Sequence, residues 1–194
     1  MNCILTASVL LFSLSALRAV ADDTKGDPAA GAAAAAEIKA GNYTFKAGAP
    51  WAVRGEPKMM SSGGATIAGK DSKPGVEADF YHFGAGGGGG EAANIARWVG
   101  QFQPGEDGAP AKPKREELKF GEKTVILVHI KGTFLTGGAM AAKKAPMPGY
   151  AMIGAIIPGE GGSVYLKVTG AEAAVTGATE DVKKLIASAF PAAK

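Results

Sequence analysis

Cysteine is almost missing from this sequence, which holds only Cys3. That residue precedes an apolar run at the N-terminus, so it belongs to a segment that we expect to be removed. The remaining chain would then carry no thiol, no disulfide and no cysteine-based metal site. A disulfide framework and a zinc site built on cysteine are therefore excluded for the mature protein.

Large apolar side chains and excess charge are also scarce. Leu, Ile, Val and Phe make up 39 of 194 residues, Gly alone contributes 29, and the formal net charge is only +3. Disordered chains normally combine few large apolar residues with high net charge, so this balance favours a folded chain with a small hydrophobic core. The same balance excludes a strongly basic nucleic-acid binder and a protein with several membrane spans.

Residues 1–21 have the pattern of a secretory signal peptide. An apolar stretch runs from Ile4 to Leu17 and ends at Ala19-Val20-Ala21, an A-x-A cleavage pattern. The stretch is shorter than the ~20 apolar residues that a spanning helix needs. An uncleaved anchor is the alternative, because no Lys or Arg precedes the stretch. The sequence therefore predicts export to the periplasm or extracellular space, with no transmembrane span after cleavage.

Residues 22–41 follow as an Ala-rich, low-complexity linker. The run Ala32–Ala36 is too short to nucleate a helix alone, and it offers no apolar face for docking. We therefore expect a tether, followed by a single folded domain over residues 42–194.

Apolar patterns within 42–194 predict an α+β fold. The expected strands are 43–45, 76–83, 123–135, 150–157 and 163–169, and the expected helices are 91–102 and 180–190. The links between the later strands leave no room for helices, so parallel winding is unfavourable. The pattern predicts a mostly antiparallel sheet packed by two helices, an α+β arrangement.

The segment 103–117 combines many charges with three prolines and is typical of a loop. Its Lys112 and Lys114, and Lys143 and Lys144 in a later loop, are expected to be solvated. They form too weak a basic patch for a nucleic-acid surface, so no nucleic-acid partner is expected.

The glycine run 84–90 leads into a helix whose polar side gives the candidate binding site. Ile95, Trp98, Val99 and Phe102 have the i, i+3, i+4, i+7 spacing of a buried face. The run lacks the Gly-Lys-Ser/Thr ending of a P-loop, so we expect a flexible connection that another backbone can approach closely. Arg97 either pairs with a neighbouring carboxylate or helps to line a shallow groove for a polar or anionic partner. The candidate binding residues are Asn94, Arg97, Gln101, Gly86, Gly87 and Gly88.

The two histidines, His82 and His129, lie in different expected strands. If those strands are neighbours, the pair could bind zinc or another metal together with Glu77 or Asp79. The alternative is two ordinary half-buried strand histidines. The sequence contains no H-E-x-x-H and no G-x-S-x-G motif, so no catalytic residue and no cofactor are nominated.

The string Asn94-Ile95-x-Arg97-Trp98-x-x-Gln101-Phe102, after its Gly-rich loop, resembles a family of small uncharacterised exported bacterial proteins of planctomycete type. Segments 131–134, 150–156 and 165–170 are also similar to that family's pattern, and the resemblance covers about residues 43–190. The family has no established activity, so the resemblance implies no substrate. The order of strands and helices also resembles the PsbP-like α/β/α sandwich, whose members are mostly accessory or scaffold proteins.

Two functions remain open from the sequence. The first is a non-enzymatic exported accessory or binding protein, a monomer whose partner is an exported protein or a cell-envelope component. The second is a hydrolytic or metal-dependent enzyme that uses His82 and His129 with a carboxylate. The lack of catalytic motifs favours the first.

Overall fold

The computed structural model describes residues 35–69, 75–136 and 145–191. The predicted signal peptide 1–21, most of the predicted linker, Lys143 and Lys144 lie outside the described residues. No helix in the described part of the chain is long and apolar enough to cross a membrane.

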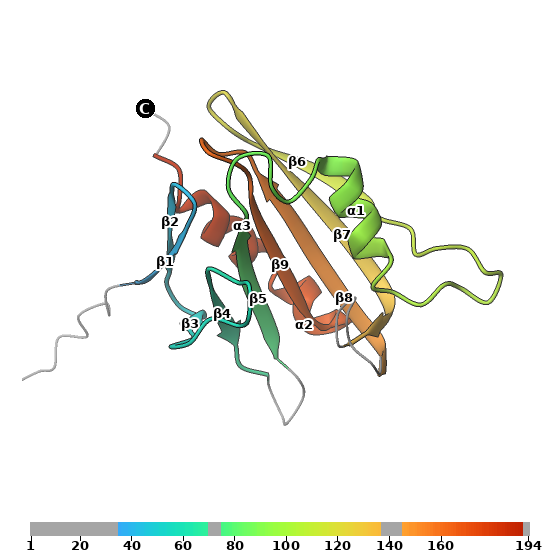
Figure 1. Cartoon of the computed structure of the whole chain (residues 1–194). Coiled ribbons are helices and arrows are strands. Elements are labelled where there is room, and N and C mark those ends of the chain that lie inside the picture. The colour runs from blue at the N-terminus through green and yellow to red at the C-terminus, as the bar shows by residue number, and fades with distance from the viewer. Residues whose placement is uncertain (1–34, 70–74, 137–144, 192–194) are drawn as a thin grey trace, which may run out of the picture. The chain divides into compact units, whose positions relative to one another are not determined.

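A seven-stranded sheet with the strand order β3-β4-β5-β9-β8-β7-β6 organises the fold (Figure 1). Every neighbouring pair of strands is antiparallel. The strands are β3 (Ala52–Val53), β4 (Gly63–Ile67), β5 (Val76–His82), β6 (Lys114–Phe120), β7 (Lys123–Leu135), β8 (Pro146–Ile157) and β9 (Val164–Ala171). The predicted α+β class with a mostly antiparallel sheet is confirmed.

Helices lie on both faces of this sheet, which gives the predicted α/β/α layering. Helix α1 (Glu91–Val99) covers one face, and α2 (Glu172–Gly177) and α3 (Thr179–Ala187) cover the other (Figure 1). The sequence predicts two helices, whereas the described residues form three. The additional helix is the short α2, which follows β9 directly. Only Val175 is buried in α2, so its sequence carries too little apolar periodicity to signal a helix.

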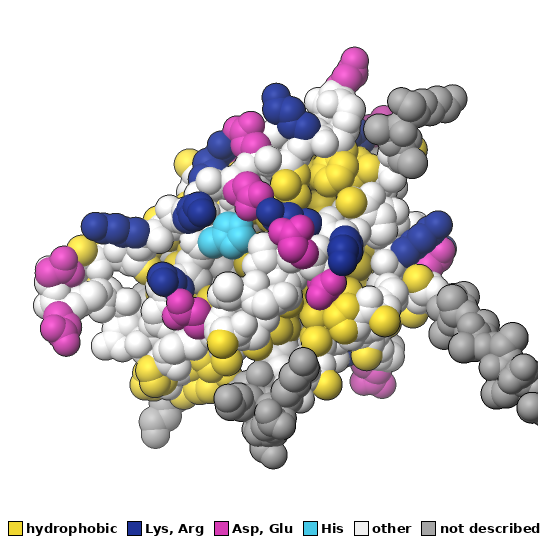
Figure 2. Space-filling model, turned by 180° about the vertical axis from the view of Figure 1, so that it is seen from behind, with side chains coloured by type: hydrophobic (Ala, Val, Ile, Leu, Met, Phe, Trp, Pro, Cys, Tyr) yellow, Lys and Arg dark blue, Asp and Glu magenta, His cyan; other side chains and the backbone are white. Residues whose placement is uncertain are grey.

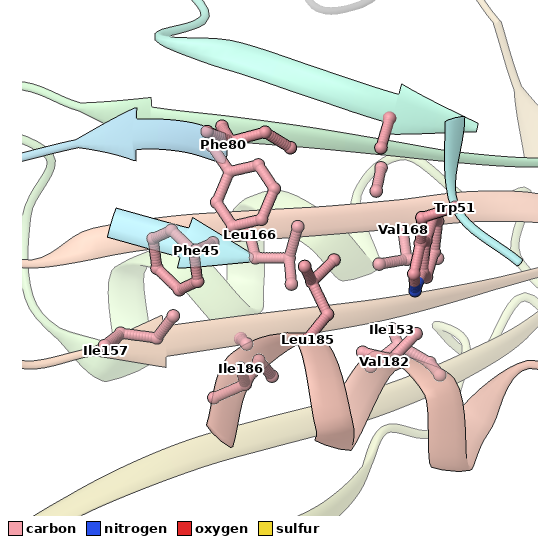
Figure 3. Packing of buried hydrophobic residues seen from close by; sticks show 14 of the residues in the cluster. Phe45, Trp51, Phe80, Ile153, Ile157, Leu166, Val168, Val182, Leu185 and Ile186 are labelled. Atoms are coloured by element: carbon pink, nitrogen blue, oxygen red, sulfur yellow. The ribbon is translucent and has the colours of Figure 1, made fainter. Parts of the chain in front are cut away.

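The larger core lies between the sheet and α2 and α3. Leu185 and Ile186 of α3 point at Leu166 and Ile157 of the sheet, and Phe45 fills the space beside them (Figure 3). The second core lies under α1. Strand β7 contributes to both, because alternate residues of its apolar run 125–128 point to opposite faces and all four are buried.

The domain starts earlier than the sequence predicts. Residues assigned to the linker form β1 (Ala36–Ala40), which pairs antiparallel with β2 (Tyr43–Ala47) in a separate two-stranded sheet. Ile38 and Ala40 are buried against the larger core. The linker boundary at residue 41 is therefore wrong, because a single Ile in an alternating pattern suffices to dock this short strand.

The predicted loop 103–117 is wrong at its C-terminal end, where β6 begins at Lys114 and forms the edge of the sheet beside β7. Its residues alternate between exposed and half-buried, and none is fully buried. An edge strand of this kind commonly carries charged side chains, which discourage pairing with other molecules. A composition that indicates a loop therefore also fits an edge strand.

Candidate functional site

The glycine run between β5 and α1 is held by the side chain of Asn94. Asn94 is only 2% exposed, and its Nδ2 donates to the carbonyl oxygens of Gly88, Gly89 and Gly90 at 2.9, 3.2 and 3.0 Å. Its Oδ1 accepts a hydrogen bond of 2.6 Å from Nη1 of Arg97. Carbonyl oxygens converge here rather than amide groups, so the loop is not built to cradle a phosphate.

Tyr165 of β9 fixes the same loop from the sheet. Its hydroxyl donates to the carbonyl of Gly89 at 2.8 Å. Gly88 has a φ of +80°, and a Cβ there would overlap the Tyr165 ring. A Cβ on Gly87 would meet the backbone of Phe83. The loop is therefore a defined conformation that requires glycine, rather than the flexible connection expected from the sequence.

The other predicted binding residues, Arg97 and Gln101, lie on α1 and just beyond its end. Arg97 is exposed and reaches the carbonyl of Gly88 at 3.4 Å in addition to Asn94. Among the described residues, no carboxylate forms an ion pair with it. Gln101 accepts a bond from Nζ of Lys167 at 3.3 Å. Burial lowers the pKa of Lys167.

One exposed aromatic beside the loop was not predicted as a site residue. Phe83 is 42% exposed and stacks with Tyr81, with ring centroids 6.3 Å apart, and it also contacts the ring of Tyr165 at 6.1 Å. Burial, followed by the nearby Asp79 carboxylate, raises the pKa of Tyr81 to about 12. The signal in the sequence was the position of Phe83, which ends an alternating strand just before the glycines.

Replacing Asn94 by alanine should destabilise the protein by about 1–3 kcal/mol, because three carbonyls lose a buried donor. Urea unfolding measures this change, and hydrogen exchange should show faster exchange of the Gly87 amide, which bonds to the carbonyl of Gly84. Gln103→Ala is the control, because Gln103 is exposed and its side chain forms no hydrogen bond within the described residues, so its loss should cost no more than about 0.5 kcal/mol. Equal losses for both variants would contradict a loop-holding role for Asn94.

The two histidines do not meet. His82 is on β5 and His129 on β7, with β9 and β8 between these strands. Three strand spacings separate the two strands by roughly 14 Å across the sheet, too far to share one metal ion. Asp79 points to the face opposite His82, and the described residues contain no group of three potential metal ligands. The condition for a shared metal site, that the two histidine strands be neighbours, is therefore not met.

His129 instead belongs to a cluster of charged side chains on the α2 and α3 face. Its Nε2 lies 3.3 Å from Oε2 of Glu116, whose other oxygen accepts a bond of 2.7 Å from Nζ of Lys183. The Lys183 hydrogen bond, helped by His129, holds the pKa of Glu116 below its usual range. The sequence does not reveal this cluster, because the charged, proline-rich segment around Glu116 predicts a loop.

Comparisons with known proteins add a likeness in fold. No family model and no curated protein matches this sequence. The chain is similar to the solution structure of cyanobacterial PsbP (CyanoP) from Synechocystis sp. PCC 6803, with a TM-score of 0.48 and 10% sequence identity. The match covers 85% of this chain and 96% of the cyanobacterial one.

Proposed function

We propose that this chain is an exported, non-enzymatic binding or accessory domain that docks a partner protein through its glycine loop. The observation that supports the proposal is a loop made almost wholly of glycine but held in one conformation by Asn94, Arg97 and Tyr165. A free glycine segment loses much conformational entropy when it binds, whereas a loop that is already fixed loses little.

The loop is flanked by two side chains of the kind that dominate protein interfaces. Phe83 lies on one side and Arg97 on the other, and both are exposed. Aromatic and arginine side chains are enriched among the residues that contribute most to binding. Between them, the exposed Gly86 and Gly89 offer backbone without side chains, which a partner backbone can approach closely.

The nature of the partner follows from the N-terminal pattern. Because residues 1–21 have the features of an export signal, we expect the partner to be an exported protein or a cell-envelope component. The domain is expected to act as a monomer that needs no cofactor. The enzyme alternative has lost its main support, since the two histidines lie on strands that are not neighbours.

Site-specific photo-crosslinking in the producing cells tests this function. A benzophenone amino acid placed at Phe83 should yield one adduct of constant mass. The matched control is the same probe at Met59, which is 90% exposed in the loop between β3 and β4. No adduct at position 83, or the same adduct from both positions, would contradict docking through the loop.

With the crosslinked partner purified, Phe83→Ala should weaken binding by about tenfold to thirtyfold, because an aromatic anchor is removed. Surface plasmon resonance or calorimetry measures the dissociation constant. Met59→Ala removes an apolar side chain of greater exposure and should leave the affinity within about twofold. If both substitutions weaken binding equally, Phe83 does not anchor the partner.

A further inference from the structure

A groove of about 570 Å³ lies on the opposite face of the sheet from the glycine loop. Strands β6, β7 and β8 line one side of it, and α2 and α3 line the other. Figure 2 views the molecule from this side and shows basic and acidic side chains gathered around a histidine. We name this cavity the lysine groove after its charged lining, which is Lys112, Lys114, Glu116, His129, Lys131, Glu172 and Lys183.

Positive charge predominates in the lysine groove. Four lysines face two glutamates there, and the glutamates are already engaged. Glu116 bonds to Lys183, and Glu172 lies 3.2 Å from Nζ of Lys131. Nζ of Lys183 also lies 3.4 Å from a carboxylate oxygen of Glu180, a residue that does not line the groove. Within the described part of the chain, Lys112 and Lys114 form no ion pair, so their charges are available to a ligand.

Glu116 holds two of the charged groups of the groove in place. Glu116 accepts from Lys183 through one oxygen and contacts His129 through the other, which fixes both side chains at the groove wall. Lys114 is the cross-strand partner of His129 on the same face of the sheet. The side chains of Lys114 and His129 therefore leave the sheet side by side, and both residues line the groove.

The remaining lining suits the carbon skeleton of a ligand. Ala151, Ile153 and Val175, which are at most 7% exposed, form an apolar floor, and the hydroxyl-bearing residues Thr176 and Thr179 add polar groups along the helical side. A volume of about 570 Å³ is far larger than an inorganic ion needs and lies within the range of small-molecule sites.

We propose that the lysine groove binds an organic anion that carries two or more carboxylate groups. Lysine ammonium groups attract such groups as point charges, and the pair Lys112 and Lys114 can engage two of them at once. A free polycarboxylate and an acidic stretch of a polysaccharide chain share this chemistry. The proposal is independent of the glycine loop, which lies on the other face of the sheet.

The test uses citrate as the free polycarboxylate and polygalacturonate as the acidic polysaccharide, each titrated into the purified protein at low salt. Both arms can be followed by calorimetry, and the affinity should fall as salt screens the charges. Lys114→Glu should weaken binding by about tenfold or more, because one attraction becomes a repulsion. If both probes bind, a free polycarboxylate is sufficient as a ligand of the groove. If only polygalacturonate binds, the ligand is the acidic polysaccharide.

Lys119→Glu is the matched control, because Lys119 lies on the same strand with its side chain on the other face and carries the same charge. It should change either affinity by less than about twofold. Equal losses for the two variants would overturn the proposal, since only net charge would then matter. Failure of both probes to bind the wild-type protein would also overturn it and would leave the lysines as protection of the edge strand.

Discussion

Replacing Gly154 by alanine should lower the free energy of unfolding by about 2–3 kcal/mol, although only a methyl group is added. Gly154 lies in the middle of β8, on the face that α1 covers, between Val128 and Lys167 of the neighbouring strands. A Cβ at this position would overlap the six-membered ring of Trp98. The indole therefore packs directly on the backbone of the strand.

Trp98 cannot move without loss elsewhere. It is only 5% exposed and is the largest residue of the core beneath α1, where it packs with residues of β7, β8 and β9. If the methyl group pushes the indole outward, α1 loses its main contact with the sheet. Trp98→Ala should itself cost about 3–5 kcal/mol, the usual cost of removing a buried aromatic side chain.

A double-mutant cycle separates this clash from an effect on the strand itself. In the Trp98→Ala background, Gly154→Ala should be neutral or stabilising, because the methyl group then enters an empty space and alanine favours strands more than glycine. Gly177→Ala is the control, since no atom lies near the Cβ that it would add. Urea unfolding measures the wild type, the two single variants and the double variant. An equal cost of Gly154→Ala in both backgrounds would contradict the contact.

The contact between Gly154 and Trp98 also shows what the sequence can and cannot predict. Apolar spacing placed Trp98 on the buried face of α1, and the structure confirms it. Nothing local to Gly154 indicates that an indole lies on it, because the two residues are far apart in sequence. This contact helps to bring together α1 and β8, which are far apart in the sequence.

Asn94 illustrates a different limit. Helical spacing assigned it to the polar side with Arg97, and a polar residue beside a glycine run suggests a ligand-binding group. The structure buries Asn94 and directs its donors to the glycine carbonyls. A side chain that binds its own backbone and one that binds a ligand have the same sequence signal, because both are polar residues next to a loop.

The sequence predicts the strand whose central residues are all buried, β7, but not the full extent of the partly exposed edge strand β6. The apolar run 125–128 predicted β7, and its bounds, Lys123–Leu135, agree with the structure. Strand β6 pairs along its whole length with β7 but was expected to be partly loop, because every one of its side chains keeps some exposure. The charged cluster around Glu116 could not be predicted without that pairing.

The second large effect concerns a carboxylate buried on β5. The alternation of β5 places Asp79 on the face away from the larger core, where solvent is expected. Instead its side chain is only 4% exposed, and the loop between β3 and β4 supplies two cations to it. The Arg54 guanidinium forms an ion pair with one carboxylate oxygen, and Nζ of Lys58 lies 3.2 Å from the other. The close approach of Arg54 requires glycine at position 64, where a Cβ would overlap the guanidinium.

Arg54→Met should destabilise the protein by about 3 kcal/mol, because it removes one of the two ion-pair partners of a buried carboxylate. The double variant Arg54→Met, Asp79→Leu should recover most of that loss, since no charge then remains buried without its partner. Glu77→Gln is the control on the same strand, because its bond to Lys58 is about half exposed and should contribute less than about 1 kcal/mol. Urea unfolding at neutral pH gives the values for Arg54→Met, Asp79→Leu, the double variant and the control. A double variant as unstable as the sum of its two single changes would show that the ion pair is not what Arg54 contributes, and that its packing over Gly64 holds the loop instead.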